Sequence, residues 1–259
     1  MRPKFGTLEW GMENNGVLTP AEKLHFLRNM AFLAVREACD VFRDKLGLLK
    51  PVYLNFSDLA APDTRMVIEA EEFARATHPH DLLFHSYRTY YFGVMLASYH
   101  ELKYDRELHF TAAILHDIGL TEARTVPLKL CCFAVSGGRQ VRDFLITKEH
   151  SAENAEIVGE AICAHLNLHL PVDEYGPEAA LVAKGAVCDL CGFEKRRIHN
   201  DSKREILHAY PAGDIQSALL SKEEMAPGSR LDFGRKLTGG LPERIWIQDT
   251  VTSKQEKAT

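Results

Sequence analysis

The sequence predicts an all-α fold, and three observations support this prediction. Apolar residues recur at intervals of three and four along most of the chain, as they do on one face of a helix. No stretch of any length alternates apolar and polar residues in the way of a half-buried strand. Residues suited to capping helix N-termini stand at the head of several apolar segments. The expectation is therefore a single helical domain with additional segments at its two ends.

Length and composition are those of an ordinary globular chain. It has 259 residues, of which 46% are hydrophobic and 26% charged. The net charge of −5 lacks the basic excess of a nucleic-acid-binding protein. The sequence shows no apolar run of bilayer length and no signal-peptide core, and its six cysteines are too few for a disulfide scaffold. We expect a cytoplasmic protein with reduced cysteines, no membrane or nucleic-acid partner, a small-molecule ligand, and a homo-oligomer left open.

The longest predicted helix begins near Thr19 and ends near Gly47. Thr19 suits the N-cap, because its side chain can accept a bond from the backbone N–H of Glu22 while Glu22 bonds back to it. Pro20 fits the first helical position. Residues 1–18 before it are expected to be irregular. Apolar residues then follow at helical spacing, namely Leu24, Leu27, Ala31, Val35, Ala38, Phe42 and Leu46.

Three further helices are predicted in the first half of the chain. The first is expected to start after Asp63 and to stop near Pro79. The second starts near Asp81, and its sequence is so apolar that we expect most of it to be buried. The third is expected to be capped by Asp105 and to end at Gly119, because glycine suits a helix C-terminus.

The second half of the chain is also expected to be helical. The stretch 120–140 is predicted to be irregular, with a turn at Ser136–Gly138. Helices are expected at about 139–146, 149–165, 177–192, 202–209 and 213–220. From about residue 221 the chain is polar, and its last dozen residues are expected to be disordered. We divide it into an N-terminal extension that packs on the core, a helical domain and a polar C-terminal segment, at 1–60, 61–220 and 221–259.

The adjacent pair His116 and Asp117 is the most informative feature for function. It follows the apolar run Phe110–Leu115, so its carboxylate is expected to be buried. An uncompensated buried carboxylate is costly, and a metal ion is a common way to compensate it. Imidazole and carboxylate are both good ligands for one divalent cation. The pair therefore predicts a metal site if further ligands converge on it.

Suitable side chains stand on three other predicted helices. His85 lies on the strongly apolar helix, with Arg88 one turn further on the same face. His165 continues the apolar stripe of its helix. Asp189 faces small apolar residues and therefore needs a cation or hydrogen-bond donors. Four helices would thus bring nitrogen and oxygen donors to one point, forming an open mixed site of the kind that activates water.

These residues belong to a wider set of motifs that resembles a known family. The motifs are His85–Arg88, Leu115–Thr121, Phe133–Gly138, Ala161–His165, Gly185–Asp189 and Tyr210–Pro211. Over roughly residues 60–215 the set resembles the HD superfamily of metal-dependent hydrolases, an all-α fold named for the His-Asp pair. Within that superfamily it is similar to the cyanamide hydratase-like branch.

The resemblance implies a site with one divalent metal ion. Its ligands would be His85, His116, Asp117 and Asp189. Zinc is the first choice, although manganese, iron and nickel suit the same donors. Asp117 and His165 are the expected catalytic residues, and Arg88 and His165 are expected to contact the substrate. The reaction expected is hydration or hydrolysis of a small polar C–N compound, cyanamide- or nitrile-like, by metal-activated water.

Other interpretations stay open. One is hydrolysis of a nucleotide or another phosphate monoester, with Arg88 and Lys184 binding the phosphate. Others are an oxygenase of the diiron type and a non-catalytic binding module. A buried ion pair between Asp189 and Arg88 would give the same pattern of buried polar residues without a metal. Two further histidines offer ligands for a second metal, His150 and His169.

Overall fold

The computed structural model describes residues 3–213, 225–239 and 246. Over this part of the chain it is all-α, which confirms the predicted fold class; the only β pairing is in isolated bridges. No helix in the described part is long and apolar enough to cross a membrane. In chain order the helical elements are α1 (Leu8–Asn14), α2 (Pro20–Lys45), η1 (Phe56–Leu59), α3 (Arg65–Thr77), α4 (His80–Tyr99), α5 (Arg106–Leu115), η2 (Ile118–Leu120), α6 (Phe133–Thr147), α7 (Ala152–Ala164), η3 (His165–Asn167), α8 (Val172–Tyr175), α9 (Pro177–Cys191), η4 (Lys195–Arg197), α10 (Asn200–Ala209) and α12 (Arg230–Thr238).

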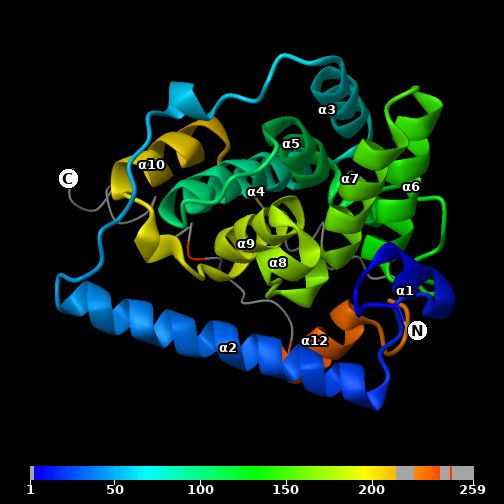
Figure 1. Ribbon diagram of the computed structural model, residues 1–259, viewed down its shortest axis with the longest axis horizontal. Coiled ribbons are helices and arrows are strands. Elements are labelled where there is room, and N and C mark those ends of the chain that lie inside the picture. The colour runs from blue at the N-terminus through cyan, green and yellow to red at the C-terminus, as the bar shows by residue number, and fades with distance from the viewer. Residues whose placement is uncertain (1–2, 214–224, 240–245, 247–259) are drawn as a thin grey trace.

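Helices α4, α5 and α9 form the centre of the molecule, and α2 runs along one edge with α12 beside its N-terminal half (Figure 1). Helix α9 lies against α4 at a glycine, because a Cβ atom on Gly185 would overlap the carbonyl oxygen of Thr89. This close approach places His85 of α4 within hydrogen-bonding distance of Asp189 of α9, at 2.6 Å from Nδ1 to Oδ2. The packing of two helices therefore sets part of the geometry of the polar interior.

Two predictions based on glycine are wrong. Ser136–Gly138 is not a turn but lies inside α6, where a Cβ atom on Gly138 would stand 2.5 Å from the carbonyl oxygen of Gly159 on α7. These small residues serve close helix packing. Gly119 does not cap α5, which ends at Leu115; it lies in η2, where an added Cβ would overlap the carbonyl oxygen of Phe133. The glycine pattern therefore reflects contacts that are remote in sequence.

Three α-helices of the described chain lie where the sequence analysis predicts none, and the shortest of them is the four-residue α8. Helix α1 falls within the segment expected to be irregular and is capped by Thr7. Helix α12 falls within the polar C-terminal segment, and the Ser229 side chain caps it by accepting from the Asp232 N–H. The spacing of serine and aspartate is the sequence signal of a capping box. The helix predicted at 213–220 and the disorder predicted for the last dozen residues lie outside the described residues, apart from residue 213.

Two of the four predicted helix caps are confirmed, and the other two are displaced by one or two residues. Thr19 and Glu22 form the predicted capping box of α2, and Asp105 caps α5 through the N–H groups of Glu107 and Leu108. Helix α3 is capped by Thr64 rather than by its neighbour Asp63, and Asp81 lies in the first turn of α4 instead of before it. These shifts of one or two residues leave the register of the helices unchanged.

Helix α2 is attached to the core through buried polar side chains. The Asn29 amide donates to the carbonyl oxygens of Asn167 and His169, at 2.9 and 3.3 Å. Near the other end, the Asp40 carboxylate accepts from Nε and Nη2 of Arg197, at 2.6 and 3.0 Å. Because these polar groups have partners, the side of α2 that carries them can face inward.

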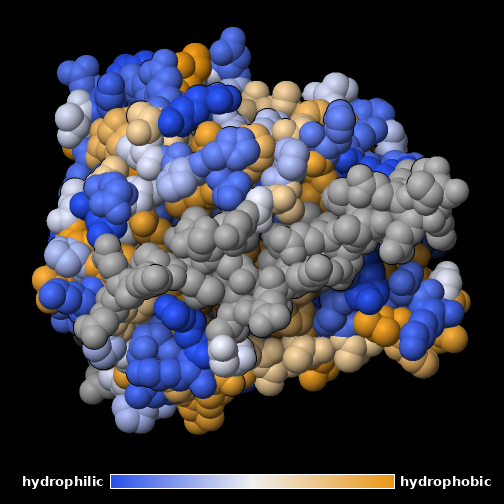
Figure 2. All heavy atoms as spheres, turned by 180° about the vertical axis from the view of Figure 1, so that it is seen from behind, coloured by the Kyte–Doolittle hydropathy of each residue, from blue (hydrophilic) through white to orange (hydrophobic). Residues whose placement is uncertain are grey.

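The apolar stripe that predicts α2 lies on its outer side. Leu24, Val35 and Phe42 are 70%, 62% and 64% exposed, whereas Leu33 is 7% exposed. Residues two positions apart in a helix point about 200° apart, so Leu33 and Val35 face opposite ways. Hydrophobic side chains gather along the edge of the molecule where α2 runs (Figure 2). The spacing of the apolar residues predicts the helix, but the hydrogen-bonded side chains of Asn29 and Asp40 decide which side of it is buried.

Alanine substitutions on the two faces of α2 are expected to differ sharply. Leu33→Ala should lower the free energy of unfolding by about 2–5 kcal/mol, because it removes buried methyl groups from the wall of the core. Val35→Ala, two residues away, should change it by less than about 0.5 kcal/mol. Urea denaturation of both variants measures the difference. Equal losses at both positions would contradict the face assignment.

Candidate metal centre

Three side chains with metal-binding donors meet in the interior. His85 comes from the second turn of α4, His116 follows the last residue of α5, and Asp117 precedes η2. They are 0%, 1% and 2% exposed. One donor atom from each lies within 4.8 Å of the other two. Of the four predicted metal ligands, the structure thus groups these three around one point.

The three donor atoms face one another closely. Nε2 of His85 lies 3.2 Å from Nε2 of His116. Oδ2 of Asp117 lies 3.3 Å from Nε2 of His116 and 3.6 Å from Nε2 of His85. Within the described part of the chain, this Oδ2 atom is buried and has no hydrogen-bond partner. The group therefore has unsatisfied capacity to bind a cation.

The other nitrogen of each imidazole fixes which atom carries the proton. Nδ1 of His116 donates to the carbonyl oxygen of Ala113 at 2.8 Å, and Nδ1 of His85 donates to Asp189 Oδ2 at 2.6 Å. In the neutral imidazoles, with both protons assigned to Nδ1 from these partners, each Nε2 presents a lone pair. Two lone pairs and a carboxylate oxygen repel one another unless something positive lies between them. A proton satisfies one such pair, whereas a divalent cation satisfies all three atoms.

Burial and neighbouring charges set the protonation of the group. Burial alone would raise the pKa of Asp117, but His116 and His85 outweigh it and hold that pKa below its ordinary value. Burial alone would lower the pKa of His116, but the Asp117 carboxylate outweighs it and raises that pKa. Burial is the main reason why the pKa of His85 is lowered. Asp117 is therefore ionised at neutral pH in a place where its charge needs a cation.

His165 stands beside this group, at the junction of α7 and η3. Its Nδ1 donates to the carbonyl oxygen of Ile162 at 2.6 Å, and its Nε2 lies 3.9 Å from Asp117 Oδ1. Burial, and then the neighbouring His116, lowers the pKa of His165 to about 3. The imidazole is therefore neutral at pH 7, with the lone pair of Nε2 directed toward the site. This geometry suits a hydrogen-bond acceptor for a group held in the site.

Asp189 and Arg88 form a buried pair next to the group. Nε of Arg88 donates to Asp189 Oδ1 at 2.7 Å and Nη2 donates to Oδ2 at 3.0 Å, while Nη1 donates to the carbonyl oxygen of Pro211 at 2.9 Å. The Asp189 carboxylate thus faces Arg88 and His85, and it orients the His85 ring. A carboxylate behind a metal-binding histidine is a common outer partner. Direct metal ligation by Asp189 and substrate contact by Arg88 stay predictions.

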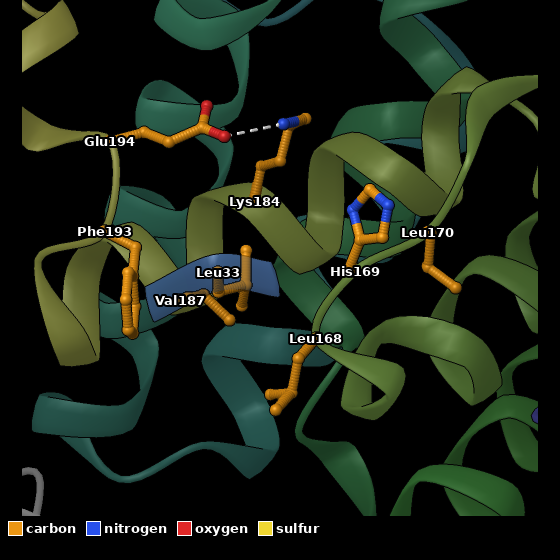
Figure 3. A pocket seen from close by; sticks show the side chains of 8 residues that line it. All are labelled: Leu33, Leu168, His169, Leu170, Lys184, Val187, Phe193 and Glu194. Atoms are coloured by element: carbon orange, nitrogen blue, oxygen red, sulfur yellow. Dashed lines mark hydrogen bonds and ion pairs between the residues drawn. The ribbon is translucent and has the colours of Figure 1, made fainter. Parts of the chain in front are cut away.

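The other predicted ligand groups point elsewhere. Lys184 pairs with Glu194 at 2.9 Å beside a small pocket between α2 and α9 (Figure 3). His150 pairs with Glu69 at 2.7 Å, and the ring of His169 packs on Phe32 with centroids 4.2 Å apart. In the described part of the chain, these groups add neither a phosphate-binding cation nor a second cluster of metal donors at the site.

The three donor atoms border a cavity of about 360 Å³, within the range of about 300–1,000 Å³ that is typical of small-molecule sites. Its walls are mainly apolar. One wall comes from α2 and another from α12, both of which are far from the donor residues in sequence. The lining side chains include Phe26, Met30, Leu33, Phe133, Leu166, Leu168, Val187, Leu190, Phe193, Arg230, Leu231 and Arg235, together with His85, His116, Asp117 and His165.

Sequence reasoning missed the contributions of α2 and α12 to this cavity. Arg230, which is 1% exposed, lies in a segment whose overall polarity gave no reason to expect a buried side chain. The capping signal of Ser229 and Asp232 was available and would have predicted the helix. It would not have predicted that the first residue of that helix enters the interior.

Comparison with known proteins bears on the segment that carries the donors. Among curated proteins, none gives a significant match to this chain. A family model described as HD domain matches residues 82–188. This segment includes His85, His116, Asp117 and His165 and ends one residue before Asp189, whereas α2 and α12 lie outside it. The match supports the placement of residues 82–188 in the HD superfamily, whose members are generally metal-dependent hydrolases.

Proposed function

We propose that this protein is a metal-dependent hydrolase or hydratase that holds one divalent cation between His85, His116 and Asp117. The observation that carries the proposal is the meeting of three metal-binding atoms, among them the unpartnered Oδ2 of Asp117, at the wall of a cavity large enough for a substrate. Two imidazoles and a carboxylate with open positions form a known type of catalytic zinc site, so zinc is proposed first. A cation bound there supplies Lewis acidity and lowers the pKa of water toward neutrality.

The surrounding residues have separable roles in this proposal. His165 accepts a hydrogen bond at Nε2 from water or substrate, because its lone pair faces the site and its Nδ1 proton is held by the carbonyl oxygen of Ile162. Asp189 holds the His85 ring in place, and Arg88 in turn holds Asp189. The apolar walls keep bulk water out, which strengthens every electrostatic interaction inside the cavity.

For the substrate we propose a compound with an electrophilic carbon bonded to nitrogen, such as a nitrile or a cyanamide. The apolar lining favours a nitrile-like group on an apolar body over a minimal polar compound. Hydrolysis of a phosphate monoester is the second candidate. The two cations that the sequence analysis assigned to a phosphate, Arg88 and Lys184, are already paired with carboxylates, so the structure does not support them in that role.

Elemental analysis and a substrate panel together test the proposal. Full-length protein purified without added chelator is expected to carry about one equivalent of a divalent metal, and His116→Ala is expected to carry none. Aliphatic and aromatic nitriles and cyanamide are then compared with nucleoside monophosphates and alkyl phosphates. Turnover of phosphates alone would overturn the substrate class, and a metal-free, inactive wild type would overturn the function. An iron-loaded protein inactive on both sets would favour the oxygenase interpretation.

A further inference from the structure

The structure shows two arginines of the described chain almost completely shielded from solvent, and only one of them has a counter-charge. Arg88 and Arg230 are 0% and 1% exposed. Arg88 engages the Asp189 carboxylate through Nε and Nη2, at 2.7 and 3.0 Å. This is the usual way in which a buried guanidinium is neutralised, with two parallel N–H donors on one carboxylate. Arg230 provides a matched comparison within the same molecule.

The contacts that the described residues make with Arg230 are all to uncharged groups. Its Nη1 donates to Asn167 Oδ1 at 2.7 Å, and its Nη2 lies 3.9 Å from the sulfur atoms of Cys132 and Cys163. Its guanidinium carbon stands 5.1 Å from the centroid of the Trp10 ring. Burial raises the pKa of the Cys163 thiol to about 12, so that thiol is uncharged at neutral pH. In the described residues no carboxylate pairs with Arg230, and its buried Nε has no hydrogen-bond partner.

These contacts leave donors of the guanidinium unused. A guanidinium has five N–H donors, and the bond to Asn167 and the two thiol contacts use three of them. A buried arginine with unused donors and no counter-ion is costly unless an anion from outside completes it. The anion has a place to come from, because Arg230 lines the cavity that also contains His116 and Asp117.

The position of Arg230 in the cavity indicates the chemical class of the ligand. Its partner Asn167 ends the short helix η3 that His165 begins, so the guanidinium lies on the His165 side of the cavity. The walls nearby are apolar and include Phe26, Met30 and Leu231. A ligand in this cavity would contact the three candidate metal ligands, the buried guanidinium of Arg230 and apolar side chains.

We propose that Arg230 binds the carboxylate of a substrate whose remaining body is apolar. For the reacting carbon this inference rests on the function proposed above; for the binding of the anion it stands on Arg230 and the cavity alone. The carboxylate accepts from the unused Nε–H and, in place of one of the long thiol contacts at 3.9 Å, from Nη2, the same pair of nitrogens that Asp189 takes on Arg88. The apolar body fills the cavity between α2 and α12. Arg230 is thus a specificity-determining residue outside the segment that matches the HD domain.

Calorimetric titration with octanoate and octanamide at pH 8 tests this inference without turnover. The two probes share the same chain and differ in charge. Full-length wild type is expected to bind octanoate at least about tenfold more tightly than octanamide, the usual gain from charge-assisted hydrogen bonds. In Arg230→Met, which keeps the length of the side chain but not its charge, this preference should disappear. Its affinity for octanamide should stay within about threefold of wild type.

Four further measurements separate this inference from its alternatives. Arg235→Gln, on the same helix and the same cavity, should retain the preference for octanoate. Asp117→Ala should also retain the preference for octanoate. If the preference is instead lost in Asp117→Ala and kept in Arg230→Met, the metal binds the carboxylate. That result would overturn the inference and support the proposed function. If Arg230→Met loses both probes and melts far below wild type, Arg230 is a structural clamp for α12 and the inference fails. Binding of octyl phosphate but not of octanoate would also overturn the carboxylate assignment.

Discussion

Asp117→Asn is expected to lower the affinity for the metal by more than about 100-fold and to remove measurable turnover. The reason is that Asp117 supplies the only carboxylate in the group of three donors that the described residues form. Asparagine keeps the shape of the side chain but removes the charge that compensates a divalent cation. Competition with a fluorescent chelator measures the affinity, and circular dichroism checks that the variant is folded.

Asp189→Asn is the matched comparison, and it decides the role that the sequence assigned to Asp189. If Asp189 acts through the His85 ring, the affinity for the metal should fall by about 10–100-fold, the usual effect of an outer partner. The variant should also lose about 3–5 kcal/mol of stability, because Arg88 is left buried without its counter-ion. A loss of metal as complete as in Asp117→Asn would show that Asp189 is a direct ligand.

Gly185→Ala should disrupt both the fold and the site. The added methyl group would overlap the carbonyl oxygen of Thr89, so α9 must move away from α4. Overlap with backbone is harder to relieve than overlap with a side chain, and we expect a loss of at least about 3 kcal/mol in the free energy of unfolding. The same movement separates Asp189 from His85, so the affinity for the metal should fall in parallel.

Gly234→Ala is the control for this prediction. It makes the same change in a helix interior, but the added Cβ would meet only the ring of Phe26 at 3.6 Å, an ordinary contact. Because alanine favours a helix over glycine, Gly234→Ala should stabilise the protein by about 0.5–1 kcal/mol. Thermal melts of the two variants should therefore shift in opposite directions. A Gly185→Ala variant as stable as wild type would contradict the close packing of α4 and α9.

The helices could be predicted from the sequence because capping residues and apolar spacing depend on residues that are close together in the chain. The capping box at Thr19 and Glu22 and the cap at Asp105 depend on residues three or fewer positions apart, and both occur in the structure. The errors at Gly119 and Gly138 have the opposite origin. Each glycine is required by a backbone atom from another helix, Phe133 in one case and Gly159 in the other. No pattern within one segment contains that information.

In the candidate site, too, some features could be predicted from neighbouring residues and others depend on helices that are distant in sequence. The inward position of His116 and Asp117 followed from the apolar run before them, and the structure buries both. The partners of Asp189 could not be chosen from the sequence, because a metal and an arginine satisfy a buried carboxylate equally well in a pattern of residues. The cavity was beyond prediction, since its walls are formed by helices separated by nearly the whole chain.

Because the candidate metal ligands and much of the cavity lining lie on different helices, the two can change independently in evolution. The candidate metal ligands lie on α4, at the end of α5 and just after it, whereas α2 and α12 shape the space in front of them. Changes in the two outer helices can therefore alter which molecules fit while the inherited chemistry persists. Homologues that keep the His-Asp pair but differ in these helices should be expected to act on different compounds, so the pair alone is a poor guide to what each of them consumes.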